Sequence, residues 1–220
     1  MIKRLIFDVD GILIRGVNFA HSIEETLKKF NLNSEENIQA FIKGIGTYEQ
    51  IYNNYNIADY TKHIGMMLKT KLPKDFVPTF FEALKTCIPT DNSEIHKTIR
   101  NLSKKYELVL LTNYFAESQM NRLNNMGIGK YFTECYGEHL IKPNTEAYIN
   151  ACGKNKPYEC IMIGDDKNLD IKGAKKAGLN TIFVNTKKID LNSRLGVAVN
   201  RVEDITDTTI SLANEYEYVR

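Results

Sequence analysis

Residues 3–11 read KRLIFDVDG, an apolar run that ends in two aspartates and a glycine. The run predicts a buried strand, and side chains two apart on a strand point the same way, so Asp8 and Asp10 would face together. Gly11 allows a sharp turn directly afterwards. Two like charges this close are costly unless a cation lies between them or one carboxyl keeps its proton. We therefore expect a divalent metal, a proton-transfer role, or both at this strand end.

The composition is that of an ordinary globular protein. Its 220 residues, 43% of them hydrophobic, suffice for one large domain or for a core with an insertion. The 29 basic and 27 acidic residues are mixed along the chain, so neither nucleic acid nor a membrane is favoured as a partner. The four cysteines show no C-x-x-C spacing, and neither a signal peptide nor a long apolar span is visible. We expect a cytoplasmic protein with reduced thiols, of an oligomeric state that the sequence does not indicate.

The segment after the first strand predicts helices. Apolar side chains recur at helical spacing in residues 22–30 and 34–43. Residues 47–85 are rich in tyrosine, isoleucine, methionine and phenylalanine, contain two prolines and show no strand-like alternation. We therefore expect residues 15–87 to form a helical insertion.

Beyond Pro89, short apolar runs alternate with helical segments, which is typical of parallel strands buried on both faces by crossover helices. Strands are predicted at 2–7, 107–111, 133–136, 160–163, 181–184 and 197–199, and helices at 116–125, 144–152, 169–177 and 206–214. The sequence thus predicts an α/β protein. Residues 1–14 and 88–220 would form a three-layer, Rossmannoid core around a parallel sheet.

Polar side chains follow several of these strands. In an open parallel α/β sheet, ligands bind outside the carboxyl ends of the strands, so these side chains are candidates for one site. They are Asp8, Asp10, Thr112, Asn113, Asp165 and Asp166, together with Asp170 one helical turn later and Lys142 before Pro143.

Structural roles compete with this interpretation. Thr112 and Asn113 could cap the following helix, and Asp165 and Asp166 could cap a helix near Asn168. Oxygen ligands alone argue against zinc. The four histidines are scattered and have no metal-ligand partner at helical spacing.

The order and content of the motifs resemble the haloacid dehalogenase-like hydrolase superfamily, in its branch with a helical cap inserted after motif one. The four motifs correspond to residues 8–13, 110–113, 142–143 and 164–170, and the resemblance covers nearly the whole chain. One departure is Ile12, where this family usually carries threonine.

The resemblance implies a Mg²⁺-dependent phosphatase that works through an aspartyl-phosphate intermediate. Asp8 would be the nucleophile, and Asp10 would protonate the leaving alcohol and then deprotonate the attacking water. Asp8, Asp165 and the backbone carbonyl of Asp10 resemble the family's Mg²⁺ ligands.

The remaining residues would support this chemistry. Lys142, the Thr112 hydroxyl and the Asn113 amide would hold the phosphoryl oxygens. Asp166 or Asp170 would serve as an outer ligand or orienting carboxylate, and the family spacing points to Asp170.

The implied partner is a small phosphorylated metabolite that the sequence does not identify. Residues Lys43, Thr47, Tyr48 and His63 of the insertion could face it. The alternatives are a phosphotransferase or phosphomutase that resembles β-phosphoglucomutase, and a non-catalytic phosphate-binding regulatory protein. Dehalogenation ranks behind these, because it does not need the acid and base that Asp10 would supply.

Overall fold

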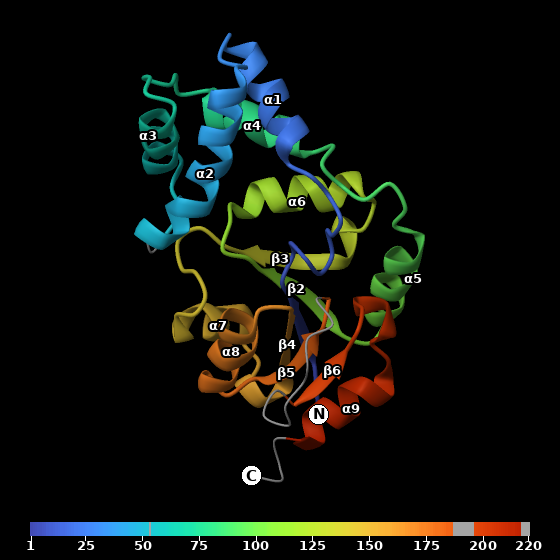
Figure 1. The fold of residues 1–220 in the computed structure, drawn as a ribbon. Coiled ribbons are helices and arrows are strands. Elements are labelled where there is room, and N and C mark those ends of the chain that lie inside the picture. Colours follow the sequence, from blue (N-terminus) through green and yellow to red (C-terminus); the bar gives the residue numbers. More distant parts are fainter. Residues whose placement is uncertain (53, 187–195, 217–220) are drawn as a thin grey trace.

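The chain is built around a parallel β-sheet. The computed structural model describes residues 1–52, 54–186 and 196–216 (Figure 1). In this part of the chain the strand order is β3–β2–β1–β4–β5–β6, and all neighbouring strands are parallel. The strands are β1 (Arg4–Phe7), β2 (Glu107–Leu111), β3 (Phe132–Tyr136), β4 (Cys160–Gly164), β5 (Asn180–Val184) and β6 (Val197–Val199). The α/β class is confirmed, and the strand that carries Asp8 at its end lies in the middle of the sheet.

Helices cover both faces of this sheet. They are α5 (Ser93–Leu102), α6 (Ala116–Asn125), α7 (Thr145–Cys152), α8 (Gly173–Lys176) and α9 (Asp207–Tyr216). Because successive strand residues point to opposite faces, Leu5 and Phe7 pack with α5, α6 and α9, whereas Ile6 packs with α7 and α8. The three-layer arrangement predicted from the sequence is therefore confirmed.

Four further helices lie beyond the carboxyl end of β1 (Figure 1). They are α1 (Ala20–Lys29), α2 (Glu35–Ile51), α3 (Ile57–Met67) and α4 (Phe76–Leu84). Their apolar sides form a second hydrophobic cluster, which also includes Phe115 and Ile141 of the sheet-bearing part. In it the ring of Phe41 lies 5.5 Å from that of Phe76 and 4.8 Å from that of Phe80. The insertion is helical, as predicted.

Helix α2 is longer than the sequence indicated. It was expected to end at Lys43 but continues to Ile51, through Gly44 and Gly46. A Cβ at Gly44 would come within 2.8 Å of the Ile64 side chain on α3. Glycine therefore allows two helices to pack closely here and does not end the first one.

Two elements in the sheet-bearing part also differ from expectation. Helix α5 was not predicted, although Ile95, Ile99 and Leu102 are buried at helical spacing. The helix predicted at 169–177 is a π-helical turn, Lys167–Lys172, followed by the short α8. This turn brings Asp170 back toward the end of β4, as described below.

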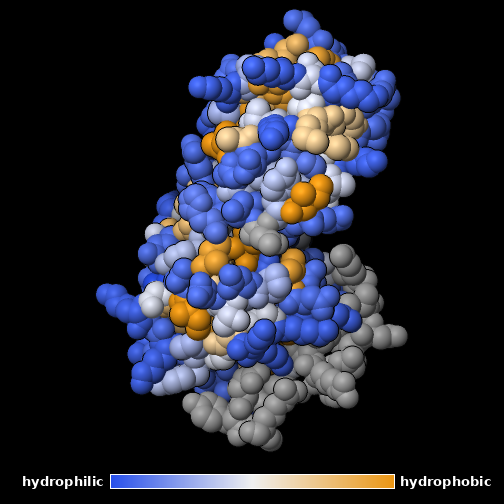
Figure 2. Space-filling model, turned by 90° about the vertical axis from the view of Figure 1, so that its left-hand side faces the viewer, coloured by the Kyte–Doolittle hydropathy of each residue, from blue (hydrophilic) through white to orange (hydrophobic). Residues whose placement is uncertain are grey.

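The surface is mainly polar (Figure 2), whereas the side chains between the layers are apolar. Hydrophilic side chains cover most of the face seen in Figure 2, and apolar patches are scattered between them. Among the described residues, no helix is both long enough and apolar enough to cross a membrane.

We propose that residues 15–87 form a cap domain separate from the core of residues 1–14 and 88–220. The buried apolar side chains of α1–α4 support this division, because they pack mainly with one another.

Truncating Phe41 tests the division into domains. Phe41→Ala removes a buried ring from the cluster of α1–α4 and should lower the free energy of unfolding by about 3–5 kcal/mol. We expect hydrogen exchange to accelerate first at the amides of α1–α4, because the lost contacts lie there. Ile99→Ala on α5 is the control, and it should accelerate exchange in the sheet instead. Equal acceleration of both parts by Phe41→Ala would show that they unfold as one unit.

Candidate active site

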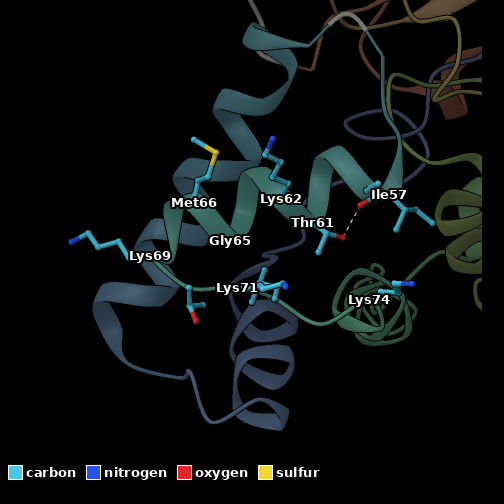
Figure 3. A pocket seen from close by; sticks show the side chains of 11 residues that line it. Ile57, Thr61, Lys62, Gly65, Met66, Lys69, Lys71 and Lys74 are labelled. Carbon is cyan, nitrogen blue, oxygen red and sulfur yellow. Dashed lines mark hydrogen bonds between the residues drawn. The ribbon is translucent and has the colours of Figure 1, made fainter.

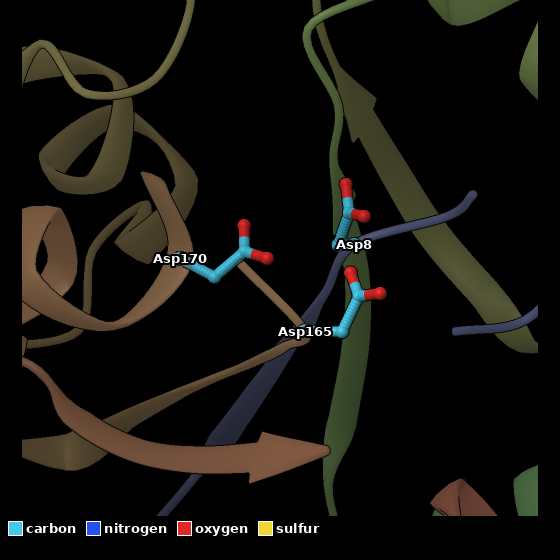
Figure 4. A group of neighbouring side chains, drawn as sticks. All are labelled: Asp8, Asp165 and Asp170. Carbon is cyan, nitrogen blue, oxygen red and sulfur yellow. The ribbon is translucent and has the colours of Figure 1, made fainter. Parts of the chain in front are cut away.

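Three carboxylates gather at the carboxyl ends of β1 and β4. Asp8 follows β1, Asp165 follows β4, and Asp170 approaches from the turn Lys167–Lys172 (Figure 4). One oxygen from each lies within 4.8 Å of the other two. The structure therefore brings together acids that are up to 162 residues apart in the sequence numbering, from Asp8 to Asp170.

A buried lysine holds two of these carboxylates. Lys142 Nζ donates to Asp8 Oδ1 at 2.8 Å and to Asp170 Oδ1 at 2.6 Å, and its side chain is 4% exposed. With all groups ionised, three carboxylates and one ammonium leave two negative charges in a desolvated place. Such a surplus favours a divalent cation.

Burial and the neighbouring opposite charges shift the pKa values of Asp8 and Lys142 in opposite directions. Burial, together with the neighbouring Asp170, raises the pKa of Asp8 to about 7 against the attraction of Lys142. Burial alone would lower the pKa of Lys142, but the carboxylates of Asp8 and Asp170 hold it above its ordinary value. Lys142 therefore stays protonated, and Asp8 is sensitive to any added positive charge.

Two glycines make room for the acids. Gly11 has φ +85°, and a Cβ there would lie 2.7 Å from Asp165 Oδ2. A Cβ at Gly164 would collide with the Asp170 side chain. Both carboxylates can therefore approach the backbone that follows β1 and β4.

The donor set fits Mg²⁺, a hard cation that prefers oxygen ligands. Asp8 and Asp165 face the same point and would be the protein ligands. Asp170 is placed behind them, because its Oδ1 accepts from Lys142 and its Oδ2 from the Asp166 backbone N–H at 3.0 Å. Asp170 therefore orients Lys142 in the manner of an outer carboxylate.

Asp10 lies in a different environment from Asp8. Arg122 donates to its Oδ1 at 2.7 Å and Gln119 to its Oδ2 at 2.6 Å. Arg122 in turn donates to Gln119 Oε1 at 2.9 Å and to the carbonyl of Cys87. A guanidinium and an amide therefore bind this carboxylate, which is not part of the group formed by Asp8, Asp165 and Asp170.

Sequence reasoning did not identify Arg122 and Gln119. They lie three residues apart on α6, where polar residues are ordinary, yet both are almost completely buried. Their spacing, which places both on one helix face, was the available signal. Their burial became visible only in the fold.

Thr112 and Asn113, the two residues after β2, make different kinds of contact. The Thr112 hydroxyl accepts from the Tyr114 backbone N–H at 3.2 Å and from Gln119 at 3.4 Å, so its own hydrogen can point toward a ligand. Asn113 donates both amide hydrogens within the protein, to Glu49 Oε1 at 2.6 Å and to the Lys142 carbonyl at 2.9 Å. Its Oδ1 accepts from the Lys142 backbone N–H at 2.7 Å. Asn113 therefore positions the lysine.

Asp166 is an N-cap. Its Oδ1 accepts from the backbone N–H groups of Asn168 and Leu169, at 2.7 and 2.8 Å. This is the structural role that the sequence left open for it, and it starts the turn that carries Asp170.

These residues line a cavity of about 340 Å³, which we call the site cavity. All the predicted site residues except Asp165 line it. Residues 15–87 contribute Phe19, Ile45, Gly46, Glu49, Tyr55 and Phe80.

The cap residues expected to face the substrate are not among those that line the site cavity. His63 is buried against Thr47 Oγ1 and the Gly44 carbonyl, both at 3.1 Å, and its ring packs edge-on to Tyr48. Lys43 also lies elsewhere on α2. The expectation was wrong because these side chains lie on other faces of α2 and α3.

Replacing Asp8 should change how stability depends on pH in metal-free buffer. Because the folded-state pKa of Asp8, about 7, exceeds the ordinary 3.8, its contribution to stability is present below the lower value and is lost as pH rises through the higher one. Wild type should therefore lose stability relative to Asp8→Asn as pH rises over this range. Urea unfolding with a chelator at several pH values measures the difference. A difference that does not vary with pH would contradict the prediction.

Known proteins share both the sequence pattern and the fold. A family model described as haloacid dehalogenase-like hydrolase matches residues 5–184. The glyceraldehyde 3-phosphate phosphatase of Methanothermobacter thermautotrophicus is 29% identical, over 94% of this chain and 97% of that protein. The protein of the same name from Methanopyrus kandleri is 26% identical, over 86% of each chain.

Solved structures of low sequence identity show the same fold. A 2-haloacid dehalogenase from Pseudomonas syringae has a TM-score of 0.72 at 17% identity, over 96% of this chain and 99% of that chain. A predicted phosphoglycolate phosphatase from Haemophilus somnus has a TM-score of 0.64 at 24% identity, over 94% and 98%. Together with the family match, they lead to one conclusion: the chain belongs to the haloacid dehalogenase-like hydrolase family.

Proposed function

We propose that the chain is a cytoplasmic, Mg²⁺-dependent phosphatase that hydrolyses a small phosphomonoester through an aspartyl phosphate on Asp8. The observation that carries the proposal is the buried Lys142 between Asp8 and Asp170, beside Asp165. It provides a nucleophile, a cation for the phosphoryl oxygens and carboxylates for a metal at one strand end. The relatives named as phosphatases support the same reaction.

In the first half of the reaction, an Asp8 oxygen attacks phosphorus and the bond to the leaving alcohol breaks. Bound at Asp8 and Asp165, Mg²⁺ would neutralise phosphoryl charge. Lys142 and the Thr112 hydroxyl would donate to the phosphoryl oxygens. The alcohol takes its proton from Asp10.

In the second half, water attacks the phosphorus of the aspartyl phosphate and Asp8 is released. Asp10 now accepts the proton from water, so the acid of the first half becomes the base of the second. Arg122 and Gln119 fix the direction of this carboxylate.

A screen of phosphorylated metabolites with and without Mg²⁺ tests the proposal, and glyceraldehyde 3-phosphate is the first compound to assay. Asp8→Asn should lower kcat by at least about 10³-fold, because the nucleophile is lost. Asp10→Asn should let labelled phosphate accumulate on the protein, because the base of the second half is lost. Absence of hydrolysis of every compound by metal-bound wild type would refute the proposal.

The same labelled protein separates the alternatives. Discharge to water identifies a phosphatase, whereas discharge to a sugar phosphate identifies a phosphotransferase or phosphomutase. A protein that binds phosphate but never becomes labelled would be a regulatory one.

Gln119 should act by positioning Asp10. We expect Gln119→Leu to lower kcat about tenfold with little change in KM, a fraction of the roughly 10²–10⁴-fold effect of a well-placed acid–base group. Steady-state kinetics with a substrate from the screen measures both constants. Gln39→Leu on the exposed side of α2 is the matched control and should leave both unchanged. An unchanged kcat in Gln119→Leu would show that this contact does not position the acid–base group.

A further inference from the structure

The cap side of the site cavity is apolar apart from the Tyr55 hydroxyl and one carboxylate. Phe19, Ile45, Tyr55 and Phe80 supply rings and an aliphatic chain to this wall. Glu49 is the one charged side chain that the described part of the cap contributes. A leaving alcohol bound here would therefore meet hydrocarbon and a single negative charge.

Both cationic side chains that line the site cavity are already paired with acids. Lys142 is bound by Asp8 and Asp170, and Arg122 by Asp10. Since both are also nearly inaccessible to solvent, neither is placed to receive an extra anionic group at the cap side.

The lysines of the cap lie elsewhere. Lys62, Lys69, Lys71 and Lys74 surround a groove of about 850 Å³ beside α3 (Figure 3). This groove shares no lining residue with the site cavity. The basic charge of the cap therefore does not offset Glu49 in the site cavity.

Glu49 is held at the mouth of the site by a specific contact. Its Oε1 accepts from Asn113 Nδ2 at 2.6 Å, and the same Asn113 amide donates to the Lys142 carbonyl at 2.9 Å. Glu49 also lines a neighbouring hollow of about 360 Å³ that shares Lys142 and Leu169 with the site cavity. The Glu49 carboxylate therefore lies at the edge of both the site cavity and this hollow, next to Lys142.

We propose that Glu49 and the apolar wall restrict the substrate to phosphomonoesters whose leaving alcohol is uncharged or cationic, and that Glu49 repels alcohols with a second anionic group. This inference rests on the proposed function and specifies its substrate class. Repulsion between like charges lowers the rate of capture of the disfavoured substrate, and an apolar wall offers that substrate no compensating contact.

Three matched aryl phosphates test the inference. Phenyl phosphate, 4-carboxyphenyl phosphate and 4-(aminomethyl)phenyl phosphate differ chiefly in the charge of the leaving group. We expect the kcat/KM of wild type to fall in the order aminomethyl, phenyl, carboxyphenyl. Because the intrinsic reactivities of the three esters differ, the diagnostic quantity is the change in each ratio between protein variants.

Glu49→Gln is the informative variant, because its amide oxygen can still accept from Asn113 while the charge is removed. The ratio of kcat/KM for 4-carboxyphenyl phosphate to that for phenyl phosphate should rise about three- to tenfold in Glu49→Gln and should rise further in Glu49→Lys. Added salt should reduce this rise, because salt screens the charge of Glu49. Glu36→Gln, an exposed carboxylate at the start of the same helix, should leave the ratio unchanged.

The outcomes separate the two proposals. Ratios that are unchanged in both Glu49 variants would overturn the role of Glu49 while leaving phosphatase activity established. A ratio that rises in Glu49→Gln without any salt dependence would assign the effect to shape and would also overturn it. No hydrolysis of any of the three esters by any variant in the presence of Mg²⁺ would count against the phosphatase proposal itself.

Discussion

The ammonium of Lys142, buried between Asp8 and Asp170, is the interaction on which the site depends. Removing one partner of a buried ion pair leaves an uncompensated charge and typically costs about 3–5 kcal/mol, so these three segments of the chain are tied together. Asn113 adds to this by binding both the N–H and the carbonyl of Lys142. The loop before α7, the end of β1 and the turn after β4 are therefore held in one arrangement.

This interaction also explains how two aspartates separated by one residue come to differ. Asp8 is buried beside an ammonium and two acids, whereas Asp10 is half exposed and is bound by a guanidinium and an amide. The first environment fits the nucleophile and metal ligand that we propose, and the second fits the proposed acid–base group.

The strand ends and the acids that follow them were predictable from the sequence. An apolar run indicates a buried strand, and the polar residue at which the run stops marks the end of that strand. The same reasoning failed where burial depends on tertiary packing. Gly44 lies inside a helix at the point where Ile64 of α3 packs against it, and the buried Gln119 and Arg122 of α6 bind Asp10. The sequence likewise gave no sign of which face of α2 meets the site, so Glu49 was missed and His63 was considered instead. The proposed domain bounds and catalytic roles stay predictions.

The cap and the core contribute different kinds of interaction to the site cavity. The core supplies the ionised groups, which are paired among themselves, and the cap supplies rings, an aliphatic chain and one carboxylate. The phosphoryl group carries the same charge in every phosphomonoester, so the groups of the core need to fit only that one group. Discrimination between substrates must then come from the wall of the site cavity that meets the leaving alcohol. Because Asn113 joins Glu49 to the backbone of Lys142, the residue that would sense the alcohol is in hydrogen-bonded contact with the loop that holds the phosphoryl group. Asn113 is therefore a direct hydrogen-bonded link between the helical insertion and the backbone of Lys142.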